Sequence, residues 1–241
     1  MDVRREVEIP GAARKLRQAV ERYKHDLWES PPLDPIDRLD PMKIPHPTLN
    51  TLNVRLELPE EIPPVESDRA IGNFPLRVGS RVDSATNQIT VARSLSEPVF
   101  RFTLAHAIAH RVLHTHEPFL SDSPRMAGDR NLSGPMTLDQ EANLFAEELL
   151  MPSSLVRSFF RRIHKEGSLR DREPDASLVS WLSQGIDHLV TVEELILRGR
   201  DYLALLVAEY VPWGEPSFSL AKRFQVAPLA MSIRLQRLHL V

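Results

Sequence analysis

Apolar residues repeat at helical spacing in some segments of this chain and alternate with polar residues in others. Residues 12–28 predict an amphipathic helix that begins after Pro10 and Gly11, because their apolar positions fall on one helical face. These positions are Leu16, Ala19, Val20, Tyr23 and Leu27. Six prolines in residues 30–47 then exclude a helix or a central strand, so we expect a connector that runs over the surface.

Two later segments show the alternation that is typical of strands. Residues 52–58 alternate apolar and polar side chains, which predicts a half-buried strand that ends at Pro59. Residues 76–82 and 89–91 flank a turn at 83–87, which predicts a β-hairpin. An edge of this sheet can pair with an extended peptide, although an ordinary structural hairpin is the simpler interpretation.

A helix is predicted immediately after the hairpin, and it is apolar around almost its whole circumference. It begins near Glu97 and Pro98, with Ser94 or Ser96 as its cap, and runs through residues 101–116. Such a helix is normally buried. His106 and His110 lie one turn apart on the same side of it, where a divalent metal ion would satisfy both rings. The alternative is that both rings bind backbone carbonyl groups.

A second helix is expected after the polar loop at residues 117–136, where Thr137 and Gln140 form a capping box. A hydrolytic zinc site needs three protein ligands and an open position. The phase of this helix favours Asp139 as the third ligand over Glu141, and it places Asn143 as an outer-shell group. The alternative role for Asp139 is a favourable interaction with the helix N-terminus.

Two further histidines follow the pair, and neither is expected to bind the metal. His114 lies on the same helical face as His106 and His110, but a continuous helix cannot wrap three residues spread over two turns around one tetrahedral ion. We therefore expect His114 and His116 to be outer-shell or surface groups, with His114 as the outer-shell candidate.

Position 107 departs from the HExxH signature of zinc peptidases, in which the Glu is the general base. Ala107 neither accepts nor donates a proton, so we expect metal binding without useful peptide hydrolysis. Loss of a general base usually costs about 10²–10⁴ in rate. The otherwise intact pattern favours deliberate replacement of the Glu over a natural pseudo-protease.

Composition limits the other possibilities. The chain has 241 residues, enough for one substantial globular domain with a smaller appendage. It contains no cysteine, so a metal must be held by His, Asp or Glu. The net charge of −3 does not require nucleic acid or an anionic membrane as a partner. Because the sequence shows neither a signal peptide nor a long apolar run, we expect a soluble cytoplasmic protein with no membrane partner.

The C-terminal third predicts a helical appendage. Basic residues gather around the helix expected at 153–167, most simply as a solvated face and alternatively as a nucleic-acid patch. Residues 175–190 and 191–211 predict two helices, the second opening with a Thr191/Glu194 capping box, with Trp181, Tyr210 and Trp213 near their contacts. Residues 219–238 resemble a helix-turn-helix, but the second helix is so apolar that we expect it to pack on the core, leaving Arg234 and Arg237 as the candidates to contact DNA.

Three spaced motifs resemble the ImmA/IrrE family of metallopeptidases. They are RFTLAHAIAHRVLH (residues 101–114), DQEANLFAEELLMP (139–152) and LAKRFQVAPLAMSIRLQRLHLV (220–241). The resemblance covers roughly residues 76–155 and 217–241. It implies a compact α+β core and a zinc-dependent endopeptidase that cleaves a helix-turn-helix repressor and so switches on phage, mobile-element, stress or defence genes.

The resemblance extends to individual positions, with three departures. His106 and His110 match the family's metal ligands, and Asp139 stands where the third ligand is usually Glu. Ala107 replaces the catalytic Glu, Asp139 is one methylene shorter than Glu, and residues 160–216 are longer than the family pattern leads us to expect.

The resulting hypothesis divides the chain into an N-terminal helix and connector (1–50), a zincin-like core with a small sheet (51–160) and a helical subdomain (161–241). The function is that of a Zn²⁺-dependent endopeptidase acting on a repressor, inactive in this chain because of Ala107. Single-stranded DNA is one candidate activator. The competing function is a pseudo-protease that binds a repressor or DNA without catalysis.

Overall fold

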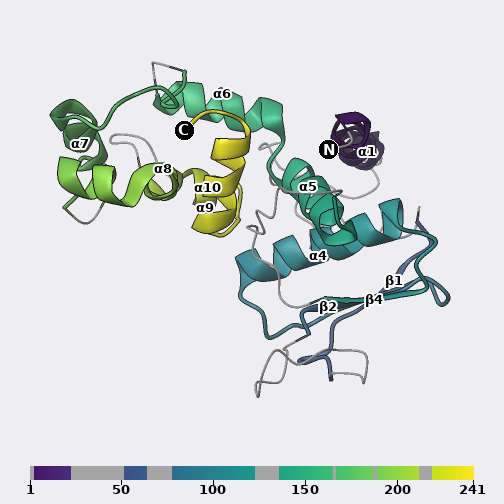
Figure 1. Ribbon diagram of the computed structural model, residues 1–241. Coiled ribbons are helices and arrows are strands. Elements are labelled where there is room, and N and C mark those ends of the chain that lie inside the picture. Colours follow the sequence, from purple (N-terminus) through teal and green to yellow (C-terminus); the bar gives the residue numbers. More distant parts are fainter. Residues whose placement is uncertain are drawn as a thin grey trace. The chain divides into compact units, whose positions relative to one another are not determined.

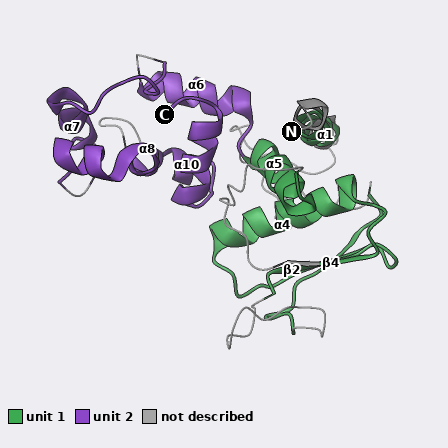
Figure 2. Ribbon diagram, viewed as in Figure 1, with its two compact units in different colours: residues 1–150 green, residues 151–241 purple. Residues whose placement is uncertain are grey.

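A computed structural model of the chain describes residues 3–22, 52–63, 78–122, 136–164, 167–186, 189–211 and 219–241. The chain divides into two compact units, residues 1–150 and 151–241 (Figure 2). The first unit combines a small sheet with helices, so the predicted α+β class is confirmed. The finer division at residues 50 and 160 stays a prediction.

The sheet of the first unit contains the predicted hairpin. Its strands are β1 (Arg55–Glu57), β2 (Ser80–Asp83), β3 (Gln88–Val91) and β4 (Phe119–Asp122), in the order β1-β3-β2-β4. β2 and β3 pair antiparallel, with Val82 opposite Ile89, and β1 pairs parallel to β3. The carboxylate of Asp83 accepts hydrogen bonds from the N–H groups of Ala85 and Thr86, which fixes the tight turn.

Both strands of the hairpin have neighbours on each side. β3 lies between β1 and β2, and β2 lies between β3 and β4, so the two edges of the described sheet belong to β1 and β4. The hairpin therefore has the ordinary structural role and offers no free edge to a peptide. β4 falls in the segment where the sequence predicted only a loop. It forms because its backbone pairs with β2, a contact between residues far apart in sequence.

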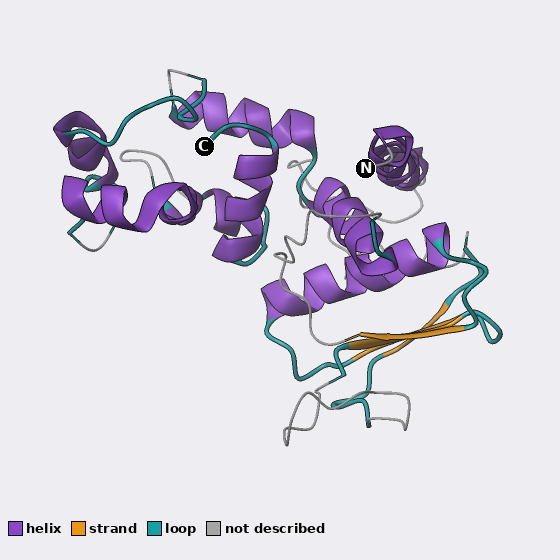
Figure 3. Ribbon diagram, in the orientation of Figure 1, coloured by secondary structure: helices purple, strands orange, loops and turns teal. Residues whose placement is uncertain are grey.

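Helices α4 (Glu97–Leu113), α5 (Leu138–Leu150) and α1 (Val3–Arg22) complete the first unit. α4 packs against β2 and β3, α5 packs on α4, and α1 packs on α5, so the helices form successive layers over one face of the sheet (Figures 1 and 3). α4 is buried from Phe100 to His110, as its apolar circumference predicts.

The N-terminal helix begins earlier than predicted. α1 begins at Val3 and continues through Pro10, whereas the sequence predicted that the helix begins only after Pro10. Ile9 and Ala13 lie one turn apart and are buried, so packing on both sides of Pro10 compensates for the hydrogen bond that proline cannot make. Arg14 also pairs with the buried Glu148 of α5, with 3.9 Å between Nε and Oε1. Residues 23–28 of the predicted helix lie outside the described residues.

Every regular element described in the second unit is a helix. Its helices are α6 (Ser153–Ile163), α7 (Ala176–Leu182), α8 (Val192–Glu209), α9 (Leu220–Arg223) and α10 (Pro228–Arg237). α8 is broken at Gly199, whose φ of 70° most side chains avoid. α7 is shorter than the predicted helix, which ran to residue 190. None of the helices described in either unit is long and apolar enough to cross a membrane.

The segment that resembles a helix-turn-helix packs into the second unit. α10 lies on α8, and its residues from Ala230 to Leu235 are buried. The guanidinium of Arg234 donates to the backbone oxygen of Met151 at 3.0 Å and to the hydroxyl of Ser153 at 3.0 Å. A helix that reads DNA must expose its polar side chains to the groove, so this geometry supports a structural role for α10.

Candidate metal centre

His106 and His110 face each other within the layer between α4 and α5. The two residues are 0% and 1% exposed, and their Nε2 atoms lie 2.9 Å apart. The i, i+4 spacing of the two residues on α4 produces this arrangement, because it places both rings on one side of the helix. The two ring edges thus point at one common position rather than at separate backbone groups.

Asp139 approaches the same position from the first turn of α5. The Thr137/Gln140 capping box fixes that turn, because Gln140 N–H donates to the Thr137 hydroxyl at 3.2 Å and Thr137 N–H donates to the Gln140 side chain at 3.0 Å. Oδ1 of Asp139 lies 3.8 Å from Nε2 of His110. The carboxylate lies nearer the surface than the sequence phase suggested, since 39% of the side chain is exposed.

These three side chains offer a donor set that fits a metal ion. One donor atom from each of His106, His110 and Asp139 lies within 4.8 Å of the other two. Donors at about 2.1 Å from a tetrahedral zinc ion lie roughly 3.4 Å apart, so small side-chain shifts would bring all three into coordination. Two imidazoles and one carboxylate are also a donor set found in catalytic zinc sites.

Asn143 holds the ring of His106 from the far side. Its Oδ1 lies 2.9 Å from Nδ1 of His106, and its side chain is buried. A carbonyl oxygen only accepts, so Nδ1 of His106 carries the proton and Nε2 presents a lone pair to the site. This contact is the one expected of an outer-shell group that orients a metal-binding histidine.

The carboxylate of Glu141 contacts a third histidine, His114, and is not among the three donor atoms that could hold a metal ion. Oε2 of Glu141 is 2.9 Å from Nε2 of His114, and Nδ1 of His114 is 2.9 Å from Nδ1 of His110. The sequence offered Glu141 as an alternative metal ligand and His114 as an outer-shell group, but it did not connect the two. His116, which follows the helix, is exposed and lies 3.5 Å from the carboxylate of Glu117.

Burial lowers the pKa of the His114 imidazole and so favours its neutral form, and the hydrogen bond with Glu141 opposes that effect without cancelling it. A neutral imidazole has one N–H and one acceptor nitrogen, so His114 can link an acceptor on one side to a donor on the other.

Ala107 lies between the two histidines and is completely buried. Its methyl group supplies no acid or base. The site therefore has the three candidate ligands and an outer-shell group, but it lacks a proton acceptor at the position where HExxH peptidases carry one.

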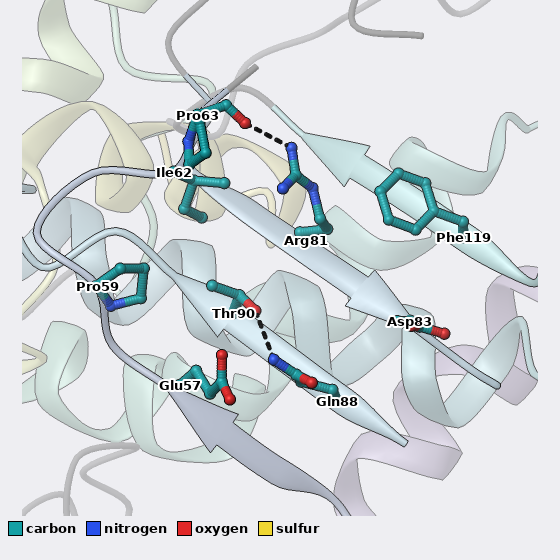
Figure 4. Close-up of a pocket in the computed structure, with 9 residues that line it drawn as sticks. All are labelled: Glu57, Pro59, Ile62, Pro63, Arg81, Asp83, Gln88, Thr90 and Phe119. Carbon is teal, nitrogen blue, oxygen red and sulfur yellow. Dashed lines mark hydrogen bonds between the residues drawn. The ribbon is translucent and has the colours of Figure 1, made fainter. Parts of the chain in front are cut away.

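A separate pocket of about 300 Å³ lies on the sheet (Figure 4). Arg81 and Thr90 line it, and they alternate with the buried Val82 and Ile89, so the pocket occupies the sheet face turned away from α4. Arg81 donates to the backbone oxygen of Pro63 at 2.8 Å, and its guanidinium lies 5.5 Å from the ring centre of Phe119. None of the three candidate metal ligands is among the residues that line this pocket.

The comparisons with known proteins agree with the three motifs. Residues 75–172 match the peptidase family model described as the IrrE N-terminal-like domain, and this range contains both helices that carry the candidate ligands. A comparison with curated proteins finds no match. The family match confirms the resemblance of the chain to the ImmA/IrrE family over residues 75–172.

Proposed function

We propose that this protein has the zinc centre of an endopeptidase that recognises a helix-turn-helix repressor, and that Ala107 leaves it able to bind but not to cut. The observation that carries the proposal is the convergence of donor atoms from His106, His110 and Asp139 on one position between two neighbouring helices. The match of residues 75–172 to a peptidase family model supports the class of reaction.

Each residue of the site has a different role in the proposed reaction. His106, His110 and Asp139 would hold zinc, which when bound supplies a Lewis acid that polarises the scissile carbonyl. Asn143 would keep the lone pair of His106 directed at the ion, because it contacts the opposite ring nitrogen. Proton removal from the attacking water needs a base, and Ala107 has none, so the rate is expected to fall by about 10²–10⁴ relative to a chain with Glu at this position.

The second candidate function is non-catalytic regulation, and the buried Ala107 favours it for the chain as it stands. Such a protein would keep zinc for structure and hold the repressor without hydrolysing it. DNA is the weaker partner for this role because α10 is buried in the second unit. Either function concerns a transcription regulator, so we expect the protein to act in the cytoplasm.

Restoring the acid at position 107 separates the two functions. The test compares Ala107→Glu with Ala107→Gln, which has almost the same shape but provides no base. Each protein is mixed with the helix-turn-helix repressor encoded beside it, with and without single-stranded DNA as an activator, and the fragments are identified by mass spectrometry.

Specific cleavage by Ala107→Glu alone, abolished by EDTA, supports the endopeptidase. Repressor binding by all three proteins with no cleavage by any supports the non-catalytic regulator. If the parent chain binds neither zinc nor repressor, the proposal is wrong. Circular dichroism of both variants checks that a larger side chain at this buried position leaves the fold intact.

A further inference from the structure

A continuous series of contacts connects His110 to a carboxylate on the neighbouring helix. His110 lies in the last turn of α4 and His114 is the residue that caps the C-terminus of this helix, with 2.9 Å between their Nδ1 atoms. His114 then reaches α5, where its Nε2 lies 2.9 Å from Oε2 of Glu141. All three residues are at most 1% exposed, so water does not compete for these contacts.

The chemistry of each group fixes the positions of the protons along this series. An ionised Glu141 only accepts, so Nε2 of His114 must carry a proton. The other nitrogen of His114, Nδ1, faces Nδ1 of His110 at 2.9 Å, and with the His114 proton directed at Glu141 this short contact is a hydrogen bond that His110 donates. The remaining nitrogen of His110, Nε2, is left with a lone pair that points at His106 and Asp139.

We propose that His114 and Glu141 are positioning residues that hold His110 in the tautomer and orientation needed to bind the metal. This inference rests on the zinc centre of the proposed function. A histidine that binds a metal commonly donates its other N–H to a partner that fixes the ring and increases its basicity. Here that partner is a second imidazole backed by a carboxylate.

The two metal-binding histidines are therefore supported differently. A neutral amide, Asn143, holds His106, whereas the negative charge of Glu141 acts on His110 through His114. His110 is expected to be the stronger donor of the two. Both supports come from α5, so the helix that supplies Asp139 also orients the two rings on α4.

The first measurement needs no variant. Long-range nitrogen–proton NMR on the zinc-loaded full chain, with nitrogen-15 in its histidines, locates the ring protons while the unprotonated Nε2 atoms of His106 and His110 both face the ion and not each other alone. We expect the proton of His110 on Nδ1 and that of His114 on Nε2. Observing the opposite tautomer for either ring overturns the inference, whatever the affinity for zinc.

The second measurement is zinc affinity, determined by competition with a chromophoric chelator. His114→Leu removes the acceptor for His110 and is expected to weaken zinc binding by about 10–100-fold. His114→Asn is the matched variant, because its Oδ1 occupies nearly the place of the imidazole Nδ1, and it is expected to restore most of the affinity. His116→Leu removes an exposed imidazole next to the site and should leave the affinity unchanged.

Two results would overturn the positioning role: equal affinity of the His114→Leu and parent proteins, or equally weak binding by the Leu and Asn variants. If His114→Leu does not fold, Glu141→Gln takes its place, because it keeps the size of the side chain while removing the charge that selects one tautomer. A parent chain that binds no zinc at all would instead overturn the proposed function, so the two failures are distinguishable.

Discussion

Buried histidines occur in both units of this protein, and their surroundings are opposite. In the first unit, His106, His110 and His114 contact one another and two polar side chains of α5. In the second unit, His164 lies between aromatic rings, with its ring centre 4.2 Å from that of Phe160 and 4.5 Å from that of Trp181. Its Nε2 has no hydrogen-bond partner among the described residues.

The comparison shows that burial alone does not identify a functional histidine. Removing an imidazole from water disfavours its charged form in either place. A polar partner fixes the tautomer of the buried ring and the direction of its lone pair, as at His106. Aromatic neighbours give no such direction, and burial with the nearby charge of Arg172 lowers the pKa of His164 to about 4. The first arrangement is suited to binding a metal ion and the second to packing a core.

The largest effect should come from adding zinc, and among the buried histidines it should depend on those of the first unit and not on His164. We expect about one zinc per chain, and a free zinc concentration 1,000 times the Kd should stabilise the folded state by about 4 kcal/mol. His106→Ala and His110→Ala should abolish both results, whereas His164→Phe should abolish neither. Metal analysis and thermal unfolding with zinc or EDTA provide the measurements. Unchanged zinc content in either alanine variant would refute the assignment of that ligand.

The second effect is a loss of stability in acid that depends on His164. Its pKa is lowered from 6.5 to about 4, so the unfolded chain binds a proton more readily than the folded one over this interval. The stability that His164 contributes is complete above pH 6.5, the pKa of histidine in the unfolded chain. It is lost as the pH falls through about 4, the pKa in the folded protein. At about 1.4 kcal/mol per pKa unit, the loss is on the order of 3 kcal/mol.

The matched variant for this effect is His164→Phe, which keeps an aromatic ring beside Phe160 and Trp181 but cannot titrate. Urea unfolding at a series of pH values from 7 to 4 gives the free energy of unfolding for the parent and the variant. Other groups titrate in both proteins, so their difference isolates His164. Parallel curves for the two proteins would show that His164 does not titrate as expected.

The third effect separates the two acids at the start of α5. Asp139→Asn removes a proposed ligand and should weaken zinc binding by more than the roughly 10–100-fold that is typical when an outer-shell partner is lost. Glu141→Gln should stay within that smaller range, because its carboxylate lies on His114. Chelator competition on both variants provides the measurement. The reverse order of affinities would make Glu141 the third ligand, the alternative that the sequence left open.

Features that depend on local spacing could be predicted from the sequence. The i, i+4 pair on α4, the Thr137/Gln140 capping box and the hairpin of β2 and β3 each depend on residues a few positions apart, and the structure has all three. The family motif limited the third ligand to two acids, and the donor atoms of Asp139 and the two histidines do lie close together, although helix phase placed Asp139 deeper than the structure does.

Features that depend on how distant segments meet could not be predicted. β4 has the composition of a loop and becomes a strand only through its pairing with β2. Helix phase placed Glu141 opposite Asp139 but gave no partner for it, because that partner depends on how α5 packs on α4. A signal was nevertheless present: His106, His110 and His114 follow one another at intervals of four, which predicts three rings in contact along one face.

The smallest effect concerns the N-terminal caps of two helices, α5 in the first unit and α8 in the second. Thr137 caps α5 in a reciprocal box with Gln140, and the hydroxyl of Thr191 accepts from the N–H of Glu194 at 3.1 Å at the start of α8. Thr137→Ala and Thr191→Ala should each lower the free energy of unfolding by about 1 kcal/mol. Only the first should also weaken zinc binding, because the turn that it loosens carries Asp139. Equal zinc affinity in the two variants would mean that packing on α4, rather than the cap, holds Asp139 at the site.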